Sequence, residues 1–352
     1  MRLASSVKFL VVAVFYFVIS SALGAAKVAD YLRQSDEWFR SVEAKEVAAN
    51  ILSFQSDAGD WPKNTNTTVH RFEGDRATLH GTFDNSATLP ELRFLAKLFS
   101  VTKAPEYEKA FLKGFDHVLE AQYANGGWPQ TSPPSKGYDR HITFNDDAMV
   151  NILNFVRDIA REHAFDFVAV ARRERAAKAF DRGIDCILKC QIRVDGQPTL
   201  WCAQHDEINF SPAKARSYEL PSFSGSESAG IVRLLMTIPK PSAEIVAAVD
   251  GAVAFFERIK LTGIREVKVD DPQSPKGWDK RIVEDPGAPP LWARFYDLKT
   301  LKPMFVDRDG LPKEKLSDIG YERRNGYSWL GNSPARVLAE YPAWKKSVAT
   351  AK

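Results

Sequence analysis

The stretch TFDNSATLPELRFLAKLF at residues 82–99 and the stretch TFNDDAMVNILNFVRDIA at residues 143–160 share one pattern. Each begins with polar residues typical of a helix N-terminus. Each then continues with apolar residues at the i, i+3, i+4 and i+7 spacing of an amphipathic helix. The stretch SFSGSESAGIVRLLMTI at residues 222–238 follows the same pattern. The chain therefore repeats one unit at intervals of about 60 to 80 residues.

Tryptophans recur in step with these stretches. Trp61, Trp128 and Trp201 lie 67 and 73 residues apart (128 − 61 and 201 − 128), and Trp278 is a candidate fourth member. We expect Trp61 and Trp128 to fill junctions between repeats in the core, although tryptophan in such loops can also stack on sugar rings. Each unit then consists of a helix, a tryptophan-bearing loop, a polar cap and a second helix. The remaining helical patterns lie at residues 104–121, 155–189 and 241–259.

Strand patterns are sparse, and no βαβ alternation is present. Repeated helix pairs with long loops on one side predict a mainly α fold, an (α/α) toroid or barrel. Residues 265–335 differ because they are rich in proline, glycine and aromatic residues. We expect this region to form irregular loops with short strands over the cleft, on the active-site face.

The N-terminus has the layout of a secretory signal peptide. Arg2 and Lys8 precede or flank an apolar run at residues 9–19, and Ala22 and Gly24 stand at the −3 and −1 positions of a cleavage site. The run is short for a membrane span, which needs about 20 residues. We therefore expect a signal peptide at 1–24, a single domain at 25–352, and a secreted protein, periplasmic or extracellular.

The composition is that of an ordinary globular protein. The 352 residues are 44% hydrophobic and 26% charged, with a formal net charge of +3. This mild excess does not argue for nucleic acid, but it suits an acidic substrate if it is concentrated in one cleft. We expect a monomer with no membrane association after signal cleavage. Among the cysteines, we expect a disulfide from Cys202 to Cys186 or Cys190, since disulfides form in exported proteins.

The two helix entrances carry adjacent acidic and amide side chains. Asp84 and Asn85 begin the first, and Asn145, Asp146 and Asp147 begin the second. One interpretation is helix capping, because carboxylates satisfy free N–H groups and oppose the helix dipole. The other is a site for a hard cation such as Ca²⁺, which takes carboxylate and carbonyl oxygens. Asp84 and Asp146 are 62 residues apart, about one repeat, so we expect them on the same face.

Three arginines stand in loops that are rich in aromatic residues, glycine or proline. These are Arg216 in KARSYELPSFSGSES, Arg294 in LWARFYDL and Arg308 in FVDRDG. Arginine binds carboxylates through two parallel N–H groups, so these loops are candidates for binding an acidic substrate. Arginines that only hold loops together are the simpler interpretation of each residue taken alone.

Six motifs in order resemble family 10 of the polysaccharide lyases, the pectate lyases. The resemblance extends from about residue 45 to residue 335. It implies an (α/α) toroid and Ca²⁺-assisted β-elimination of polygalacturonate, which gives 4,5-unsaturated oligogalacturonides. The motifs are TFDNSATLPELRFLAKLF, GGWPQ, ITFNDDAMVNIL, ARSYELPSFSGSES, PLWARFYDL and PMFVDRDG.

The resemblance also implies roles for individual residues. Asp84 and Asp146 match acidic residues of the calcium and substrate site, with Asn85 beside them. Arg216 matches the catalytic base of the family. Because the pKa of arginine is above about 12, such a base needs nearby cations to lower it, or a lysine or a water held by Arg216 takes the proton.

The remaining two arginines, Arg294 and Arg308, match those that bind substrate carboxylates. In the reaction, a cation on the uronate carboxylate stabilises the charge that develops when the C5 proton is removed.

Two other functions fit the same residues. An (α/α) glycoside hydrolase would use Asp84 and Asp146 as its pair of carboxylates, separated by about 5 to 9 Å. A non-catalytic polyuronate-binding protein would rely on its aromatic residues and would not need Arg216. Products that absorb in the ultraviolet and sensitivity to EDTA distinguish the lyase from both.

Overall fold

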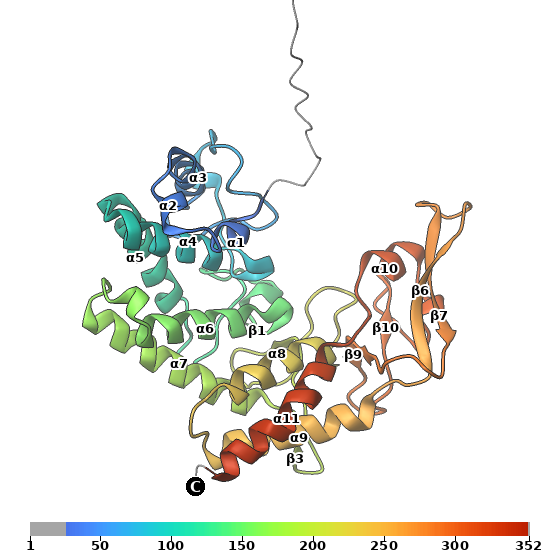
Figure 1. Ribbon diagram of the computed structural model, residues 1–352. Coiled ribbons are helices and arrows are strands. Elements are labelled where there is room, and N and C mark those ends of the chain that lie inside the picture. The colour runs from blue at the N-terminus through green and yellow to red at the C-terminus, as the bar shows by residue number, and fades with distance from the viewer. Residues whose placement is uncertain (1–25, 351–352) are drawn as a thin grey trace, which may run out of the picture.

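The computed structural model describes residues 26–350, so the expected signal peptide at 1–24 lies outside the described residues. Helices dominate the fold, and Figure 1 shows them as a curved array with a strand-bearing region along one side. The prediction of a mainly α fold built from repeated helix pairs is confirmed. The helices are α1 (Val28–Tyr31), α2 (Asp36–Phe39), α3 (Val42–Ser53), α4 (Leu89–Thr102), α5 (Pro105–Glu120), α6 (Ala148–Arg161), α7 (Val170–Cys190), α8 (Gly225–Met236), α9 (Ala243–Ile259), α10 (Tyr321–Gly326) and α11 (Ser333–Thr350).

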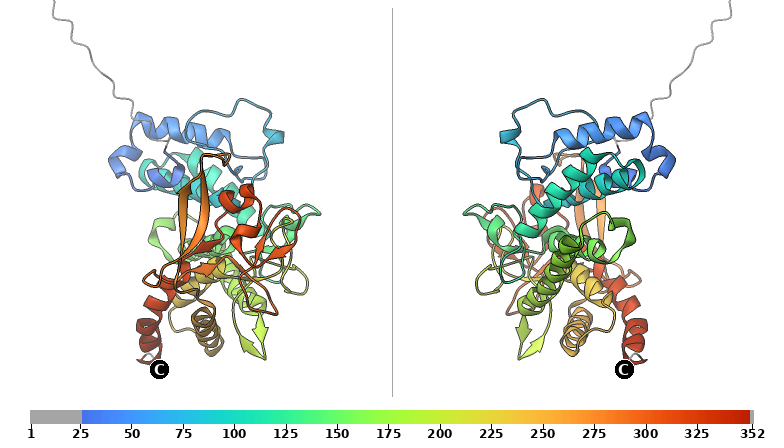
Figure 2. Two further views of the ribbon diagram at one scale, coloured as in Figure 1. Left: turned by 90° about the vertical axis from the view of Figure 1, so that its right-hand side faces the viewer. Right: turned by 90° about the vertical axis from the view of Figure 1, so that its left-hand side faces the viewer.

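Helices pair in the order of the chain. α4 packs against α5, α6 against α7 and α8 against α9, while α11 packs against both α8 and α9. α4, α6 and α8 also contact one another in turn, and α5, α7 and α9 do the same, which gives two parallel rows. Figure 2 shows the first helices and α11 at opposite ends of this array. Among residues 26–350, no helix is long and apolar enough to span a membrane.

Each repeat is joined to the next by a buried tryptophan. Trp61, Trp128 and Trp201 are all fully buried, which confirms the core position expected for the first two. Their indole N–H groups donate to backbone carbonyls near the ends of α3, α5 and α7, at 2.8, 2.8 and 2.7 Å respectively. The last four carbonyls of a helix lack the usual i+4 backbone donor, so the indole N–H supplies a donor there; at Ile51 it adds to the N–H of Phe54. The same interaction recurs in every repeat and explains the spacing of the tryptophans.

The fourth member of this series is Trp292, and the prediction of Trp278 is wrong. The Trp292 indole donates to the carbonyl of Phe256 in α9 at 2.9 Å. Trp278 instead begins β7 and is partly exposed, with Lys268 Nζ 4.0 Å from its ring centroid. The spacing misled because a long hairpin lies between α9 and the tryptophan that ends its repeat.

The helical run expected at 155–189 is interrupted. α6 ends at Arg161, and α7 begins at Val170 after a short 3₁₀ turn, η5 (His163–Phe165). Phe165 is buried and Phe167 partly buried in the connection, where both rings pack on Phe111 of α5. A continuous helix could not direct both rings to that place, so packing between repeats overrides the local helical pattern.

The region that follows α9 contains a longer strand pair than expected. β6 (Ile264–Asp270) and β7 (Trp278–Glu284) form a seven-residue antiparallel hairpin. A second, smaller core with Tyr218, Phe295 and Trp329 lies under the loops of this region. The other strands have two residues each: β1 (Ile142–Thr143), β2 (Arg193–Val194), β3 (Gln197–Pro198), β4 (Gln204–His205), β5 (Phe223–Ser224), β8 (Trp292–Ala293), β9 (Phe295–Tyr296), β10 (Phe305–Val306), β11 (Pro312–Lys313) and β12 (Leu330–Gly331).

The expected disulfide is absent. Cys186, Cys190 and Cys202 are all buried free thiols. Burial and the neighbouring Cys186 thiol raise the pKa of Cys190, and burial also raises the pKa of Cys202. These side chains therefore serve as small apolar groups in the core.

Candidate active site

The two helix entrances follow one backbone path. η2 (Asp84–Ser86) precedes α4 and η4 (Asn145–Asp147) precedes α6, and the two turns lie side by side. Asn85 has φ 50° and ψ 35°, and Asp146 has φ 51° and ψ 34°. By backbone, Asn85 therefore corresponds to Asp146, and the sequence equivalence of Asp84 with Asp146 is off by one residue. Left-handed non-glycine residues in both turns are the kind of strain that is found at functional sites.

The first entrance places one carboxylate inside and one amide outside. Asp84 is buried, and its Oδ2 is 2.5 Å from Lys63 Nζ. Asn85 is exposed and donates from Nδ2 to Asn64 Oδ1 at 3.0 Å. Asp84 is therefore partly neutralised by a lysine that the sequence analysis did not identify.

At the second entrance, three oxygens converge on one atom of Arg294. Arg294 Nη2 is 3.1 Å from Asn145 Oδ1, 3.1 Å from Asp146 Oδ1 and 2.9 Å from Glu227 Oε1. A terminal guanidinium nitrogen has two hydrogens, so it cannot satisfy three acceptors equally. The Nε of the same arginine is buried without a hydrogen-bond partner among the described residues. The site is therefore richer in oxygen ligands than Arg294 alone can satisfy.

The position of Arg294 is fixed by the strands around it. Its backbone N–H donates to Trp329, and its carbonyl accepts from Gly225 at the start of α8. It stands between β8 and β9, which pair with β12 and β5 respectively. The side chain lies over the ring of Tyr327, with 4.7 Å from the guanidinium carbon to the ring centroid. Nearby anions, Glu227 first, raise the pKa of Arg294 against the opposing effect of burial.

The carboxylates here outnumber the cations beside them. Asp147 is mostly buried, and desolvation, followed by the charges of Glu227 and Asp146, raises its pKa to about 6. One oxygen of Asp147 is buried without a hydrogen-bond partner among the described residues. Glu227, which is also buried, accepts from Ser224 of β5. This excess of oxygen and negative charge favours a cation near the second entrance.

Arg216 is held by a buried glutamate. Its Nε donates to Glu219 Oε2 at 2.7 Å, and its Nη2 donates to the other carboxylate oxygen. Glu219 also accepts from the Tyr327 hydroxyl at 2.8 Å. The hydrogen bonds to Glu219 are the main cause that raises the pKa of Arg216. Tyr327 therefore connects the two arginines, because its hydroxyl contacts the partner of Arg216 while its ring stacks on Arg294.

A fourth arginine joins this group. Arg323 of α10 lies 4.5 Å from the ring centroid of Tyr218, and Arg308 lies 6.0 Å from the same centroid. Arg308 and Arg323 both pair with Glu322. The structure thus places Arg216, Arg294 and Arg308 around Tyr218 and Tyr327. The sequence patterns did not identify the other members, Glu219, Glu227, Arg323 and Tyr327. Of these, only Glu219 and Glu227 lie in a quoted motif.

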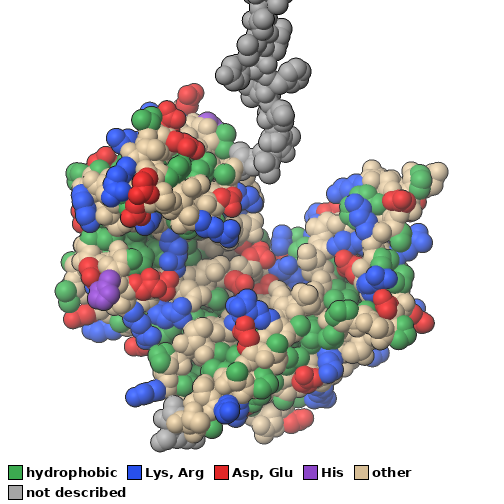
Figure 3. Space-filling model, in the orientation of Figure 1, with side chains coloured by type: hydrophobic (Ala, Val, Ile, Leu, Met, Phe, Trp, Pro, Cys, Tyr) green, Lys and Arg blue, Asp and Glu red, His purple; other side chains and the backbone are tan. Residues whose placement is uncertain are grey.

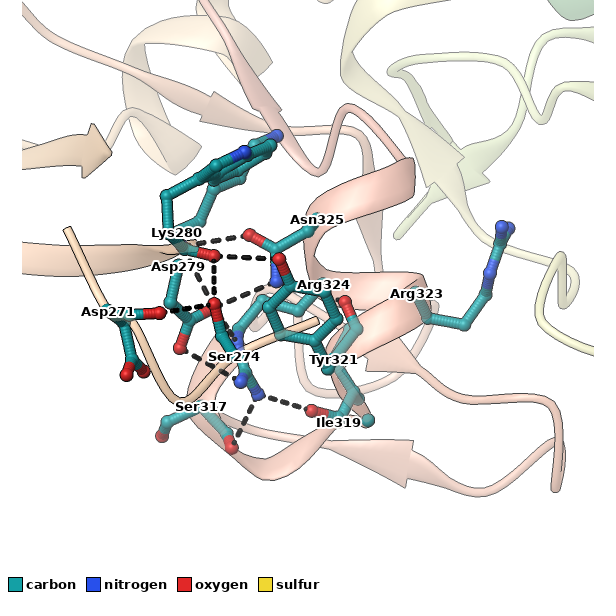
Figure 4. A network of polar contacts seen from close by, with 12 residues as sticks. Asp271, Ser274, Asp279, Lys280, Ser317, Ile319, Tyr321, Arg323, Arg324 and Asn325 are labelled. Carbon is teal, nitrogen blue, oxygen red and sulfur yellow. Dashed lines mark hydrogen bonds and ion pairs between the residues drawn. The ribbon is translucent and has the colours of Figure 1, made fainter. Parts of the chain in front are cut away.

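The hairpin holds α10 in place from its other side. Asp279 of β7 accepts from Arg324 at 2.8 and 3.0 Å and from Asn325 at 2.8 Å. Figure 4 shows this network on one side of α10, with Arg323 pointing away from it on the opposite side. Lys280 Nζ also donates to the carbonyl of Tyr327 at 3.2 Å. The hairpin therefore positions the helix that carries Arg323.

The surface between the two parts of the molecule is hollowed. Figure 3 shows a broad groove between the N-terminal helices and the hairpin-bearing region, with acidic side chains at its floor and basic side chains on its walls. Such a distribution suits an anionic chain that brings, or meets, a cation at the floor.

A different group of side chains has the spacing of a metal site. Ligand atoms of His141, Asp206 and Glu207 lie within 4.8 Å of one another. Glu207 is already paired with Arg140 at 2.9 Å and with His141 at 2.8 Å. The three side chains therefore have a structural explanation as a link between two loops.

The fold and these residues define an (α/α) carbohydrate-active enzyme with a groove for an acidic polysaccharide. A family model for pectic acid lyase matches residues 55–338. The chain belongs to this family, and it is a polysaccharide lyase.

Solved structures agree. A family 10 polysaccharide lyase from Cellvibrio cellulosa is 35% identical, with a TM-score of 0.76 over 88% of this chain and 95% of that one. A mutant of a family 10 polysaccharide lyase from Cellvibrio cellulosa, in complex with trigalacturonic acid, is 35% identical, with a TM-score of 0.77 over 90% of this chain and 95% of that one. No curated protein sequence matches the chain.

Proposed function

We propose that this chain is a pectate lyase that cleaves de-esterified polygalacturonate by β-elimination and releases 4,5-unsaturated oligogalacturonides. The observation that carries the proposal is the group of arginines around Tyr218 and Tyr327, beside the acidic turns. Four guanidinium groups in one place suit a substrate with a carboxylate on every sugar. The complex of the related lyase with trigalacturonic acid supports the same substrate class.

We propose Ca²⁺ as the cofactor, held by Asp146 with Asp84 and Asn85. The donor chemistry fits, because carboxylate and amide oxygens of Asp146 and Asn145 converge within hydrogen-bond distance of a single Arg294 atom. Glu227 adds a third oxygen there. When bound, the ion withdraws charge from the uronate carboxylate and so stabilises the enolate-like transition state.

The arginines orient the sugar. Arg294 is held by backbone bonds and by the Tyr327 ring, so it presents a fixed cation to a uronate carboxylate. Arg308 is largely exposed on its loop, with a 65% accessible side chain. Its side chain is therefore free to move and bind the carboxylate of a second uronate. Fixing the substrate in this way lowers the entropic part of the barrier. Arg294 and Arg308 are thus the proposed substrate-binding residues, together with Asp84.

Arg216 is the proposed catalytic residue, acting on the C5 proton. Its ion pair with Glu219 keeps it protonated without substrate, because that pair raises its pKa. Removal of the C5 proton therefore requires the guanidinium to lose a proton first, which the neighbouring cations Arg308 and Arg323 favour. The C5–H electron pair forms the C4–C5 double bond as the C4–O bond breaks, and the leaving glycosidic oxygen keeps the C4–O pair and takes up a proton from solvent.

The test is the ultraviolet absorbance of the new double bond. The mature chain is incubated with polygalacturonate with and without Ca²⁺, alongside the variants Arg216→Ala and Asp146→Ala. We expect a Ca²⁺-dependent rise that falls by about 10²-fold or more in both variants. New reducing ends without absorbance would identify a hydrolase that uses Asp84 and Asp146. Binding without turnover would identify a polyuronate-binding protein.

We also propose that the chain is secreted as a monomer after loss of residues 1–24, and that the region 265–335 covers the active-site face of a single catalytic domain. An enzyme that acts on a polymer too large to enter the cell must act outside the cytoplasm. Mass spectrometry of the exported protein tests the cleavage site, and light scattering tests the oligomeric state.

A further inference from the structure

A pocket lies beside the first helix entrance. It has a volume of about 720 Å³, within the range of about 300 to 1,000 Å³ of small-molecule sites. Four short segments line it: residues 27–29, 62–67, 85–87 and 90–91. They come from α1, from the loop after Trp61, from η2 with the residue after it, and from the start of α4.

The rim of this pocket consists of amides, hydroxyls and lysines. Asn64, Thr65, Asn85 and Ser86 are exposed on it, and Lys27 stands at its edge. These groups donate and accept hydrogen bonds in the way that sugar hydroxyls and uronate carboxylates require. Asn64, Asn85 and Ser86 have φ of 60°, 50° and 57°, so the rim keeps its shape through backbone conformations that are costly for non-glycine residues.

The floor of the pocket contains the carboxyl group of Glu91, which lies in the first turn of α4 close to the backbone of Thr88. Glu91 is buried, with Oε1 accepting from Thr67 Oγ1 at 3.1 Å. Its second oxygen, Oε2, is buried without a hydrogen-bond partner among the described residues. Burial raises the pKa of Glu91 to about 7, so the group is a hydrogen-bond donor for part of the time near neutral pH. An unsatisfied polar group of this kind costs free energy and is uncommon in native structures.

The pocket is continuous with the active site through two residues. Lys63 lines it and pairs with Asp84, and Asn85 lines it while following Asp84 in the same turn. A polysaccharide that binds at Asp84 can therefore place a neighbouring sugar in the pocket.

We propose that this pocket, with Lys27, Asn64, Ser86 and Glu91, is a distal subsite that binds a further galacturonate unit of the substrate chain. The proposal rests on the proposed function for the identity of the sugar. The site takes the hydroxyls with Asn64 and Ser86 and the carboxylate with Lys27. It gives long oligomers an advantage over short ones without touching the reacting atoms.

A chain-length series tests the subsite. The double variant Lys27→Ala/Ser86→Gly removes one cation and one hydroxyl, and glycine tolerates the left-handed φ of 57° at position 86. We compare kcat/KM for oligogalacturonides from the trimer to the hexamer. In the wild type we expect kcat/KM to rise at one length. In the variant we expect a loss of about 5- to 10-fold for the lengths beyond that rise, and less than about two-fold below it.

The matched control is Lys240→Gly, which removes a lysine and a left-handed residue, φ 51°, in the turn between α8 and α9. It should leave the whole series unchanged. Equal losses at every length, or none at any length, in the double variant would overturn the subsite. If the wild type cleaves no oligomer, the proposed function fails instead. In that case the affinity for saturated hexagalacturonate, measured by calorimetry, tests the subsite. Weaker binding by the double variant than by the wild type supports the subsite, and equal binding refutes it.

Discussion

Glu219 is the residue on which the chemistry of Arg216 depends. It accepts from the Arg216 side chain through both oxygens and from Tyr327 through one. A carboxylate in that position raises the pKa of the guanidinium, which opposes the role of a base. Because Glu219 keeps Arg216 protonated and less able to accept the C5 proton, the contribution of Glu219 must be a different one. Its two hydrogen bonds fix the orientation of the Arg216 guanidinium.

Replacing Glu219 with glutamine keeps the shape and removes the charge. The pKa of Arg216 then falls, so the neutral form appears at lower pH. We expect the rising limb of the kcat–pH profile to move down by about 1 to 3 pH units. Tyr327→Phe keeps the Glu219 charge and should leave that limb in place. An unchanged limb in Glu219→Gln would show that Arg216 is not the base.

Asp147 predicts a dependence of stability on pH. Its pKa in the folded chain is about 6, above the usual aspartate value of 3.8, so the folded state binds the proton more tightly than the unfolded state. Its contribution to stability is therefore present below about pH 4 and is lost as pH rises to about 6. Asp147→Asn should raise the free energy of unfolding at pH 7 by about 1 to 2 kcal/mol and have little effect at pH 4. Urea denaturation in EDTA at both pH values measures this, and an equal gain at both would contradict it.

At the scale of elements, the tryptophan junctions hold the helix pairs together. Trp128→Phe removes the indole N–H that serves Val118 and leaves a space in a fully buried position. We expect a loss of about 2 kcal/mol in the free energy of unfolding. Trp278→Phe is the matched control, because that ring is partly exposed on the hairpin, and it should cost well under about 1 kcal/mol. Similar losses in the two variants would refute the distinction between them.

The sequence reveals these junctions because they are local. The bond from Trp61 to α3 and the bond from Trp128 to α5 each link residues ten positions apart, so spacing and periodicity predict them. The fourth junction links residues 36 positions apart across a hairpin, and there the spacing failed.

The site depends on longer separations still. Arg294 meets Asn145 from 149 positions away, and Tyr327 meets Glu219 from 108 positions away. Motifs identified the arginines because their loops are distinctive. They could not identify the distant partners, because no local pattern records a contact between repeats; Glu219, which is three residues from Arg216, is a local partner that the motif contained.

At the scale of the whole molecule, charge guides the substrate. Of the formal net charge of +3, two charges come from Arg2 and Lys8 in the expected signal peptide, so the attraction arises from the basic side chains on the walls of the groove. Surface attraction of this kind is screened over about 10 Å at 0.1 M salt. We therefore expect KM for polygalacturonate to rise several-fold between about 20 and 200 mM NaCl at constant Ca²⁺, with kcat nearly unchanged. A KM that is independent of salt would show that contact, and not steering, sets the affinity.

The three buried thiols make it possible to measure local opening of the structure through the rate at which a thiol reagent labels them. Cys186 and Cys190 lie on α7 and Cys202 lies just beyond Trp201, so all of them belong to the middle of the array. A thiol reagent reaches them only when that part of the structure opens, because the reactive thiolate is both rare and shielded. The rate of labelling in native buffer therefore measures how often the central repeat comes apart, without any introduced probe. Adding oligogalacturonide to the same experiment shows whether bound substrate slows the labelling. A slower rate would mean that the substrate stabilises the N-terminal helices and the hairpin-bearing region on the two sides of the groove.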